Sequence, residues 1–244
     1  MVWDTATGER LHTLRDTTDT MMAVQDLAVD PEDSTEGEIV IVSASSDPHI
    51  RRWRISLSSA SQIVDLAPEA KGKPSRQTIL QHETSVYRVL FWGDDEDTDL
   101  WTASADGTAK CLSRAKNWSA EETYEHGDYV RAITVAGDWV VTAGRDEDVK
   151  VWDRSTGKLR HVYEGHYEEI TGLVALAGER AVSVSIDGTV RTWELSRSAL
   201  EKAIKEKEDA AKGVSKEKKV EVKESVLTAE EEAELAELMG SESE

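Results

Sequence analysis

The segment Val141-Thr142-Ala143-Gly144-Arg145-Asp146, with Trp152-Asp153 beginning six residues after its last aspartate, decides the fold of this 244-residue chain. Three further segments align with it without gaps, at residues 42–47, 101–106 and 182–187. Each carries Ser or Thr four positions before its Asp, and Trp53, Leu112 or Trp193 stands six positions after that Asp. A spacing that occurs four times predicts a repeated supersecondary unit.

The residues around these segments have the pattern of short strands. Stretches such as Val190-Arg191-Thr192-Trp193 alternate apolar and polar side chains, which is typical of half-buried strands. Upstream of three of the aspartates a His stands at a predicted turn: His82, His126 and His166. An alternating apolar run follows each His, so every repeat predicts several antiparallel strands.

The repeat resembles that of the WD40 family of β-propellers, with Trp152-Asp153 and Gly165-His166 as its clearest dipeptides. The resemblance covers residues 1–195. It implies an all-β fold in which each repeat forms a four-stranded blade and the blades pack radially around a channel. It also implies that His, Ser or Thr, Asp and Trp form a hydrogen-bonded structural network. That network is assigned to His126, Thr142, Asp146, Trp152, His166, Ser183, Asp187 and Trp193.

Two repeats depart from the family pattern. Leu112 stands where the others have Trp, which predicts an incomplete network and a looser blade. No His precedes Val24, where the sequence reads Arg15-Asp16-Thr17-Thr18-Asp19.

The first residues predict that the chain opens inside a blade. Met1-Val2-Trp3-Asp4 has the pattern of a third strand, and residues 11–14 that of a fourth. We therefore expect a WD40-type β-propeller of which these four repeats are the C-terminal part of a longer ring with about seven blades. A closed four-bladed ring and an eight-bladed dimer are the alternatives.

The composition changes after residue 195. We expect WD40 repeats over 1–195, a charged helix and linker over 196–225, and an acidic tail over 226–244 that contains a short amphipathic helix. The first helix is predicted at residues 198–212 and the Lys-rich linker at 213–225. In the tail, Leu235, Leu238 and Met239 form one apolar edge. A helix that docks on a partner and a solvated acidic tail are both open interpretations.

Charge and composition exclude several classes of function. Asp and Glu number 49 against 29 Lys and Arg, a formal charge of −20, which disfavours nucleic acids and anionic membranes as direct partners. One cysteine, Cys111, excludes an internal disulfide framework. The sequence contains no phosphate-binding loop, hydrolase elbow or metal-ligand spacing, so we expect no catalytic residue, metal or cofactor. We expect an intracellular protein, either cytoplasmic or nuclear.

The function that this pattern favours is a non-catalytic scaffold for protein–protein interaction. Tyr87, Tyr129, Arg145 and Tyr167 are the predicted partner-binding residues on the upper face. The first alternative is a recognition module for basic tails, such as those of histones or ribosomal proteins, which would meet acidic loops near residues 30–38 and 94–99 on the lower face. The alternative from another class is an enzyme with its active site at the mouth of the channel. The oligomeric state is left open.

Overall fold

The computed structural model describes residues 1–16, 22–64, 78–94, 97–177 and 179–220. It divides the chain into a first unit, Met1–Ser196, and a second unit that begins at Arg197. Within the described residues no helix is long and apolar enough to cross a membrane.

The first unit is built from antiparallel strands. Their bounds are β1 (Val2–Trp3), β2 (Arg10–His12), β3 (Val24–Val29), β4 (Glu38–Ser45), β5 (Asp47–Ser56), β6 (Ala60–Gln62), β7 (Ile79–Leu80), β8 (Val86–Asp94), β9 (Asp97–Ser104), β10 (Thr108–Ser113), β11 (Ser119–Glu125), β12 (Val130–Ala136), β13 (Trp139–Gly144), β14 (Val149–Asp153), β15 (Leu159–Tyr163), β16 (Ile170–Leu176), β17 (Arg180–Ser185) and β18 (Val190–Glu194).

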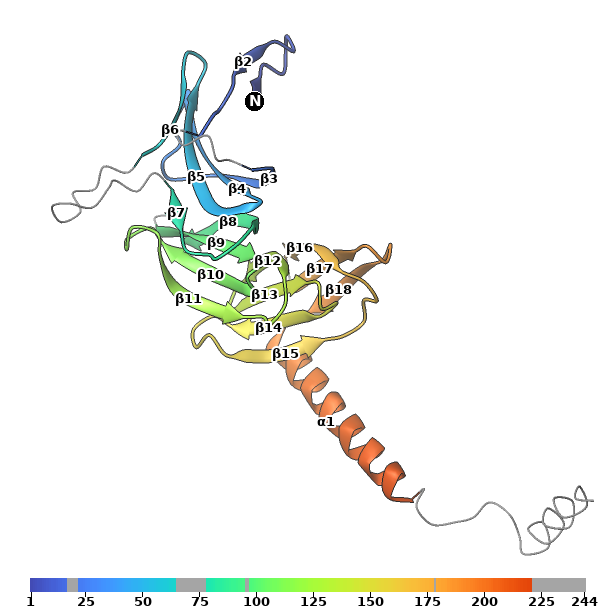
Figure 1. Ribbon diagram of the computed structural model, residues 1–244. Coiled ribbons are helices and arrows are strands. Elements are labelled where there is room, and N and C mark those ends of the chain that lie inside the picture. Colours follow the sequence, from blue (N-terminus) through green and yellow to red (C-terminus); the bar gives the residue numbers. More distant parts are fainter. Residues whose placement is uncertain (17–21, 65–77, 95–96, 178, 221–244) are drawn as a thin grey trace, which may run out of the picture. The chain divides into compact units, whose positions relative to one another are not determined.

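These strands form sheets in sequence order, which we call blades. The blades are β3-β4-β5-β6, with β7 also paired to β5, then β8 to β11, then β12 to β15, and last β16-β17-β18. The first strand of each blade lies against the first strand of the next, so that β3, β8, β12 and β16 follow one another along the inner side (Figure 1). The predicted all-β class with repeated four-stranded sheets is confirmed.

The hydrophobic core lies between neighbouring blades. One cluster joins Val42 and Ala44 of the first blade to Val86 and Leu100 of the second. A second cluster joins Trp101 and Tyr124 of the second blade to Val130, Ile133 and Trp152 of the third. Burial of each such aliphatic side chain contributes roughly 1.5–3 kcal/mol, and therefore the blade interfaces hold this unit together.

The described blades form an open arc. Leu27 and Val29 on β3 and Val174 on β16 are exposed, so the first and last blades do not cover each other. The closed four-bladed ring is therefore not the observed arrangement. The longer ring of about seven blades stays a prediction.

The second unit begins with a helix that is longer than its sequence pattern predicted. Helix α1 spans Arg197–Val220, so residues 213–220 of the predicted linker are helical. Lys and Glu are good helix formers, and the ion pairs Lys202–Glu206 and Lys212–Glu208 join successive turns. These contributions offset the helix-breaking tendency of Gly213, which had suggested a boundary.

Candidate functional site

Each first strand contains a β-bulge at the same position. In β12, Val130 pairs with Gly144 and Ala132 pairs with Ala143, which leaves Arg131 as the extra residue. The equivalent extra residues in the other three blades are Gln25, Tyr87 and Thr171. A bulge redirects its side chain out of the sheet and is common beside binding sites. We use the term bulge face for the end of the blades that carries these residues together with Tyr129, Arg145, Tyr167 and Glu169.

A ladder of side chains crosses three blades on this face. The guanidinium carbon of Arg131 lies 4.1 Å from the ring centroid of Tyr87, which belongs to the preceding blade. Arg131 Nε also donates to Glu169 Oε1, just before the first strand of the following blade. A cation stacked on an aromatic ring and paired with a carboxylate is held in one orientation. The bulge face therefore presents a pre-organised guanidinium.

The other predicted partner-binding residues lie at the same end. Arg145 stacks on Tyr129 at 5.1 Å, and its backbone N–H donates to the Tyr129 carbonyl at 3.0 Å. Tyr129 is 42% exposed and Tyr167 is 78% exposed. The structure thus brings Tyr87, Tyr129, Arg145 and Tyr167 to one face. Exposed aromatic and Arg side chains are the groups that most often dominate protein interfaces.

Sequence reasoning missed Arg131 and Glu169. The signal was present, because Arg131 follows directly after Val130, the first buried residue of its strand, as Tyr87 follows Val86. Comparing that position across the repeats would have found the bulge residues.

Hydrogen-bonded networks hold the turns beside the bulge face. His126 Nδ1 lies 2.9 Å from Thr142 Oγ1, and its Nε2 lies 2.9 Å from Asp146 Oδ1. Trp152 Nε1 donates to the same Thr142 hydroxyl at 2.7 Å.

The last blade has the same arrangement. His166 lies 2.6 Å from Ser183 Oγ and 3.0 Å from Asp187 Oδ2, and Trp193 Nε1 donates to Ser183 at 2.8 Å. The eight residues of the predicted network are therefore brought together in two sets of four. Each set links two strands, the turn between them and the turn that precedes the blade.

The electrostatics of these networks fit a structural role. Burial by itself would raise the pKa of Asp146, but hydrogen bonds from His126 and Lys150 outweigh it and lower the pKa to about 2. Hydrogen bonds from Thr189 and His166 likewise lower the pKa of Asp187. A carboxylate that transfers protons near neutral pH needs a raised pKa, whereas these carboxylates stay ionised as anchors for imidazole and ammonium groups.

The second blade is well packed although it lacks the Trp. His82 still joins Thr102 at 2.7 Å and Asp106 at 2.8 Å. Leu112 is completely buried in one cluster with Leu100 and Trp118. Apolar packing thus surrounds the residue that replaces the Trp. The lower stability of this blade stays a prediction.

The first blade replaces the missing His by a buried ion pair. Arg51 Nε lies 2.9 Å from Asp16 Oδ2, and Arg51 Nη1 lies 3.0 Å from Asp47 Oδ1. Trp53 Nε1 donates to Ser43 Oγ at 2.8 Å, so the Trp–Ser part of the pattern is kept. The sequence indicates a role for Arg51, because each repeat has a basic residue four positions after its Asp. These residues are Arg51, Lys110, Lys150 and Arg191.

The acidic loops at the opposite end are partly neutralised within the chain. Arg114 lies 2.6 Å from Asp30, 3.2 Å from Glu32 and 3.3 Å from Asp33. Residues 94–99 were expected to be a loop, but β8 runs to Asp94 and β9 begins at Asp97. This end therefore offers a smaller free acidic surface than the sequence suggested.

Two other predictions concern residues beyond these sites. Leu235, Leu238 and Met239 of the predicted tail helix lie outside the described residues. In the part of the chain that the structure describes, no group of three or more His, Cys, Asp or Glu side chains is placed to hold a metal ion.

Burial raises the pKa of the Cys111 thiol, with the Asp99 carboxylate adding to the effect, so this thiol is kept protonated.

The repeats match a known family. The model of the "WD domain, G-beta repeat" matches residues 119–153 and 157–194, which contain strands β11 to β14 and β15 to β18. This chain belongs to the WD40-repeat family. The open arc is accordingly a WD40-type propeller fold.

Similar proteins agree with this assignment. An uncharacterised WD repeat-containing protein of Schizosaccharomyces pombe is 34% identical over 199 residues, covering 81% of this chain and 47% of that protein. The nuclear distribution protein PAC1 of Saccharomyces cerevisiae is 27% identical over 135 residues, covering 54% of this chain and 25% of PAC1. This WD40 chain thus spans half or less of the length of these relatives.

Solved structures show the same fold. The WD40 β-propeller domain of Doa1 matches with a TM-score of 0.54 and 21% identity, covering 72% of this chain and 52% of the Doa1 chain. At this identity the match concerns the fold alone.

Proposed function

We propose that this WD40 chain is a non-catalytic scaffold that binds a partner protein through its bulge face. The observation that carries the proposal is the ladder from Tyr87 through Arg131 to Glu169. It combines an aromatic ring, a guanidinium and a carboxylate from three successive blades on a rigid framework. Groups fixed in this way lose little conformational entropy when a partner binds.

The neighbouring pair Tyr129–Arg145 extends this surface. Tyr129 is half exposed, and Arg145 covers one side of its ring. Tyr167, from the turn before the last blade, adds a largely exposed ring. Together these side chains form an aromatic and cationic patch of the kind that supplies most of the binding energy in protein interfaces.

The test compares partner capture by two matched variants. Arg145→Ser removes an exposed cation from the bulge face, and Lys116→Ser removes one from the β10–β11 turn at the other end of the blades. Partners that bind the bulge face are recovered with wild-type protein and with Lys116→Ser, and are depleted at least about tenfold with Arg145→Ser, a loss of roughly 1.4 kcal/mol. Equal recovery by both variants contradicts the proposal.

A basic segment in the partner is a finer form of this proposal. The turns and strand ends at the bulge end carry several carboxylates: Glu83, Glu125, Asp128, Glu147 and Glu168. With the formal charge of −20, these groups favour an approaching Lys- or Arg-rich segment. Binding of a synthetic Lys- and Arg-rich peptide should weaken steeply with salt and be reduced by Glu168→Gln. Binding that is absent, or is insensitive to salt, contradicts the basic-segment form and leaves the Arg145 test unaffected.

A further inference from the structure

The β13–β14 turn of the third blade departs from the repeat on the bulge face. It reads Gly144-Arg145-Asp146-Glu147-Asp148, and only its Asp146 matches the other blades. We call these five residues the third-blade turn. At its first position the strand register places a serine in each of the other blades, namely Ser45, Ser104 and Ser185. Departures from a local rule are expected where a functional requirement opposes it.

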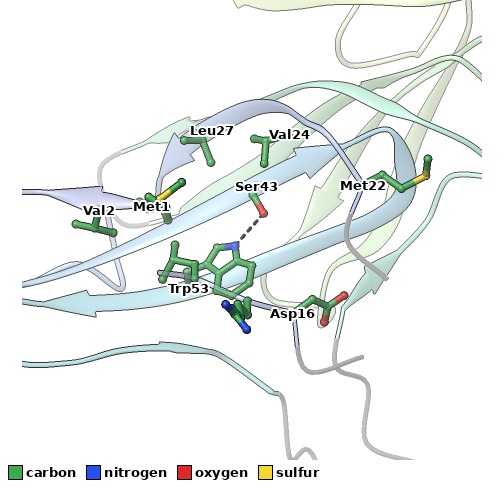
Figure 2. A pocket seen from close by; sticks show the side chains of 11 residues that line it. Met1, Val2, Asp16, Met22, Val24, Leu27, Ser43 and Trp53 are labelled. Carbon is green, nitrogen blue, oxygen red and sulfur yellow. Dashed lines mark hydrogen bonds between the residues drawn. The ribbon is translucent and has the colours of Figure 1, made fainter. Parts of the chain in front are cut away.

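The strands on either side of the third-blade turn keep the repeat. The indole N–H of Trp152 donates to Thr142 Oγ1 at 2.7 Å. Figure 2 shows the same bond in the first blade, from Trp53 to Ser43, at 2.8 Å. Strands β12 to β15 pair in order, and Val149 at the start of β14 is completely buried. The departures are therefore confined to the turn, and the blade itself does not require them.

Gly144 allows the segment before β12 to approach the turn closely. A Cβ atom at this residue would lie 1.8 Å from the carbonyl oxygen of Tyr129, a distance at which the two atoms clash. In the second and fourth blades, the serine at this position donates its hydroxyl to a carbonyl of the preceding turn, at 2.9 and 2.8 Å. The Tyr129 carbonyl thus occupies the space that a serine side chain takes elsewhere, and the Arg145 N–H donates to it at 3.0 Å.

This close approach places Tyr129 and Arg145 against each other. The guanidinium carbon of Arg145 lies 5.1 Å from the centroid of the Tyr129 ring. Because the tyrosine stays 42% exposed, the stacked pair presents both an aromatic surface and guanidinium N–H groups on the bulge face. A side chain at residue 144 would separate the two backbones that hold this pair together.

Glu147 adds a carboxylate at a position where two other blades have glycine. Its φ is +69°, and the equivalent Gly107 and Gly188 have φ values of +86° and +79°. A residue with a Cβ atom is strained in this left-handed region, whereas glycine is not. In the part of the chain that the structure describes, no ion pair or side-chain hydrogen bond engages the Glu147 carboxylate. The third-blade turn thus keeps a strained residue whose carboxylate is free to meet a partner.

We propose that the third-blade turn selects the partner of the bulge face, with Glu147 pairing to an arginine side chain of that partner and Gly144 positioning Tyr129 and Arg145 beside it. This inference rests on the proposed function, because it names the residues that make the bulge face selective. An arginine fits because its guanidinium donates two parallel hydrogen bonds to a carboxylate and also packs on an aromatic ring. The N–H groups of Arg145 then donate to backbone carbonyls of the same segment.

The test is the affinity of the full chain for a labelled peptide of alternating Arg and Ala, measured by fluorescence anisotropy. Glu147→Gly should weaken binding about fivefold through loss of the ion pair. Its urea midpoint should not fall, because glycine adopts this φ without strain. The matched control is Glu179→Gly, since Glu179 has a φ of +55° and lies in the β16–β17 turn at the opposite end of the blades. This control should leave the affinity unchanged.

Gly144→Ser tests the positioning of Tyr129. The serine side chain displaces the Tyr129 carbonyl, so the peptide should again bind about fivefold more weakly. In a Tyr129→Ser background the same substitution should have no further effect on the affinity, because Gly144 acts through that ring. An effect of equal size with and without the tyrosine overturns the positioning role. If Gly144→Ser does not fold, the comparison of Glu147→Gly with Glu179→Gly decides.

The outcomes separate this inference from the proposed function. A wild-type chain that does not bind the peptide overturns the arginine site, and so do equal affinities for Glu147→Gly and Glu179→Gly. Partner capture that still depends on Arg145 would then show that the bulge face binds through other selective groups. Loss of peptide affinity in Glu147→Gly but not in Glu179→Gly supports the inference, whatever proteins the capture experiment recovers.

Discussion

Arg51 and Asp16 form a completely buried ion pair, with 2.9 Å between Arg51 Nε and Asp16 Oδ2 and no exposed surface on either side chain. Arg51 stands at the position that Lys110, Lys150 and Arg191 hold in the other repeats. Arg51 also reaches Ser45 Oγ and Asp47 Oδ1, each at 3.0 Å. The guanidinium thus joins Asp47 to a hydroxyl, as the imidazole does in the other blades, but this hydroxyl belongs to Ser45 and not to Ser43. Its permanent charge requires a carboxylate beside it.

Removing one partner of this pair should destabilise the chain strongly. Asp16→Ala removes the carboxylate at Arg51 Nε and leaves that of Asp47 alone beside the buried guanidinium. Because one buried charged donor loses its acceptor, we expect a loss of about 3 kcal/mol in the free energy of unfolding, measured with urea. The control is Glu38→Ala, which breaks the Arg54–Glu38 pair between side chains that are 51% and 40% exposed. Exposed pairs of this kind contribute about 0–1 kcal/mol. Similar losses for both variants would contradict the structural role of Asp16.

Loss of the Thr142 hydroxyl should lower the free energy of unfolding markedly. It accepts the Trp152 indole N–H and bonds the His126 ring, so Thr142→Val leaves two buried polar groups without a partner. Each such group costs about 1–3 kcal/mol, and we expect a loss in that range or above it. Thr123→Val, on an exposed position of β11, should change the free energy of unfolding by less than about 0.5 kcal/mol.

Restoring the family Trp in the second blade should destabilise it. Leu112 has no exposed surface and packs with Leu100 and Trp118, so Leu112→Trp forces a larger ring into occupied space. Overpacking of this kind costs about 1–3 kcal/mol. Denaturation midpoints measure the effect, and an increase in stability would show that this blade does have room for the indole.

Acid should weaken the third blade through Asp146. Its pKa is lowered from 3.8 to about 2, so the stabilisation is fully present above its ordinary pKa and disappears as the pH falls from about 4 to about 2. Asp146→Asn removes this titration, and its free energy of unfolding should fall less over that range than that of the wild-type chain. Parallel pH profiles of the two proteins would contradict this assignment. Asp187, whose pKa is also lowered, still titrates in both.

The repeat could be predicted from the sequence because its determinants are local. Thr142, Asp146 and Trp152 are close in sequence and repeat at constant spacing, and alternation of apolar residues such as Val149 and Val151 marks each strand. The bounds of the acidic loop expected at residues 94–99 were wrong, because strand pairing of β8 with β9 outweighs the preference of Asp for turns.

The sequence by itself determined the blades, the His–Asp–Trp networks and the candidate binding residues Tyr129 and Arg145, since these depend on periodicity and on contacts within one repeat or its neighbour. Only the tertiary structure decided that Arg51 meets Asp16, that Arg131 lies over Tyr87, and that Leu27 and Val174 are left on open faces. These contacts join residues that are far apart in the chain, or depend on which blades lie side by side. Local propensity carries no information about such pairings, because they arise only when packing brings distant surfaces together.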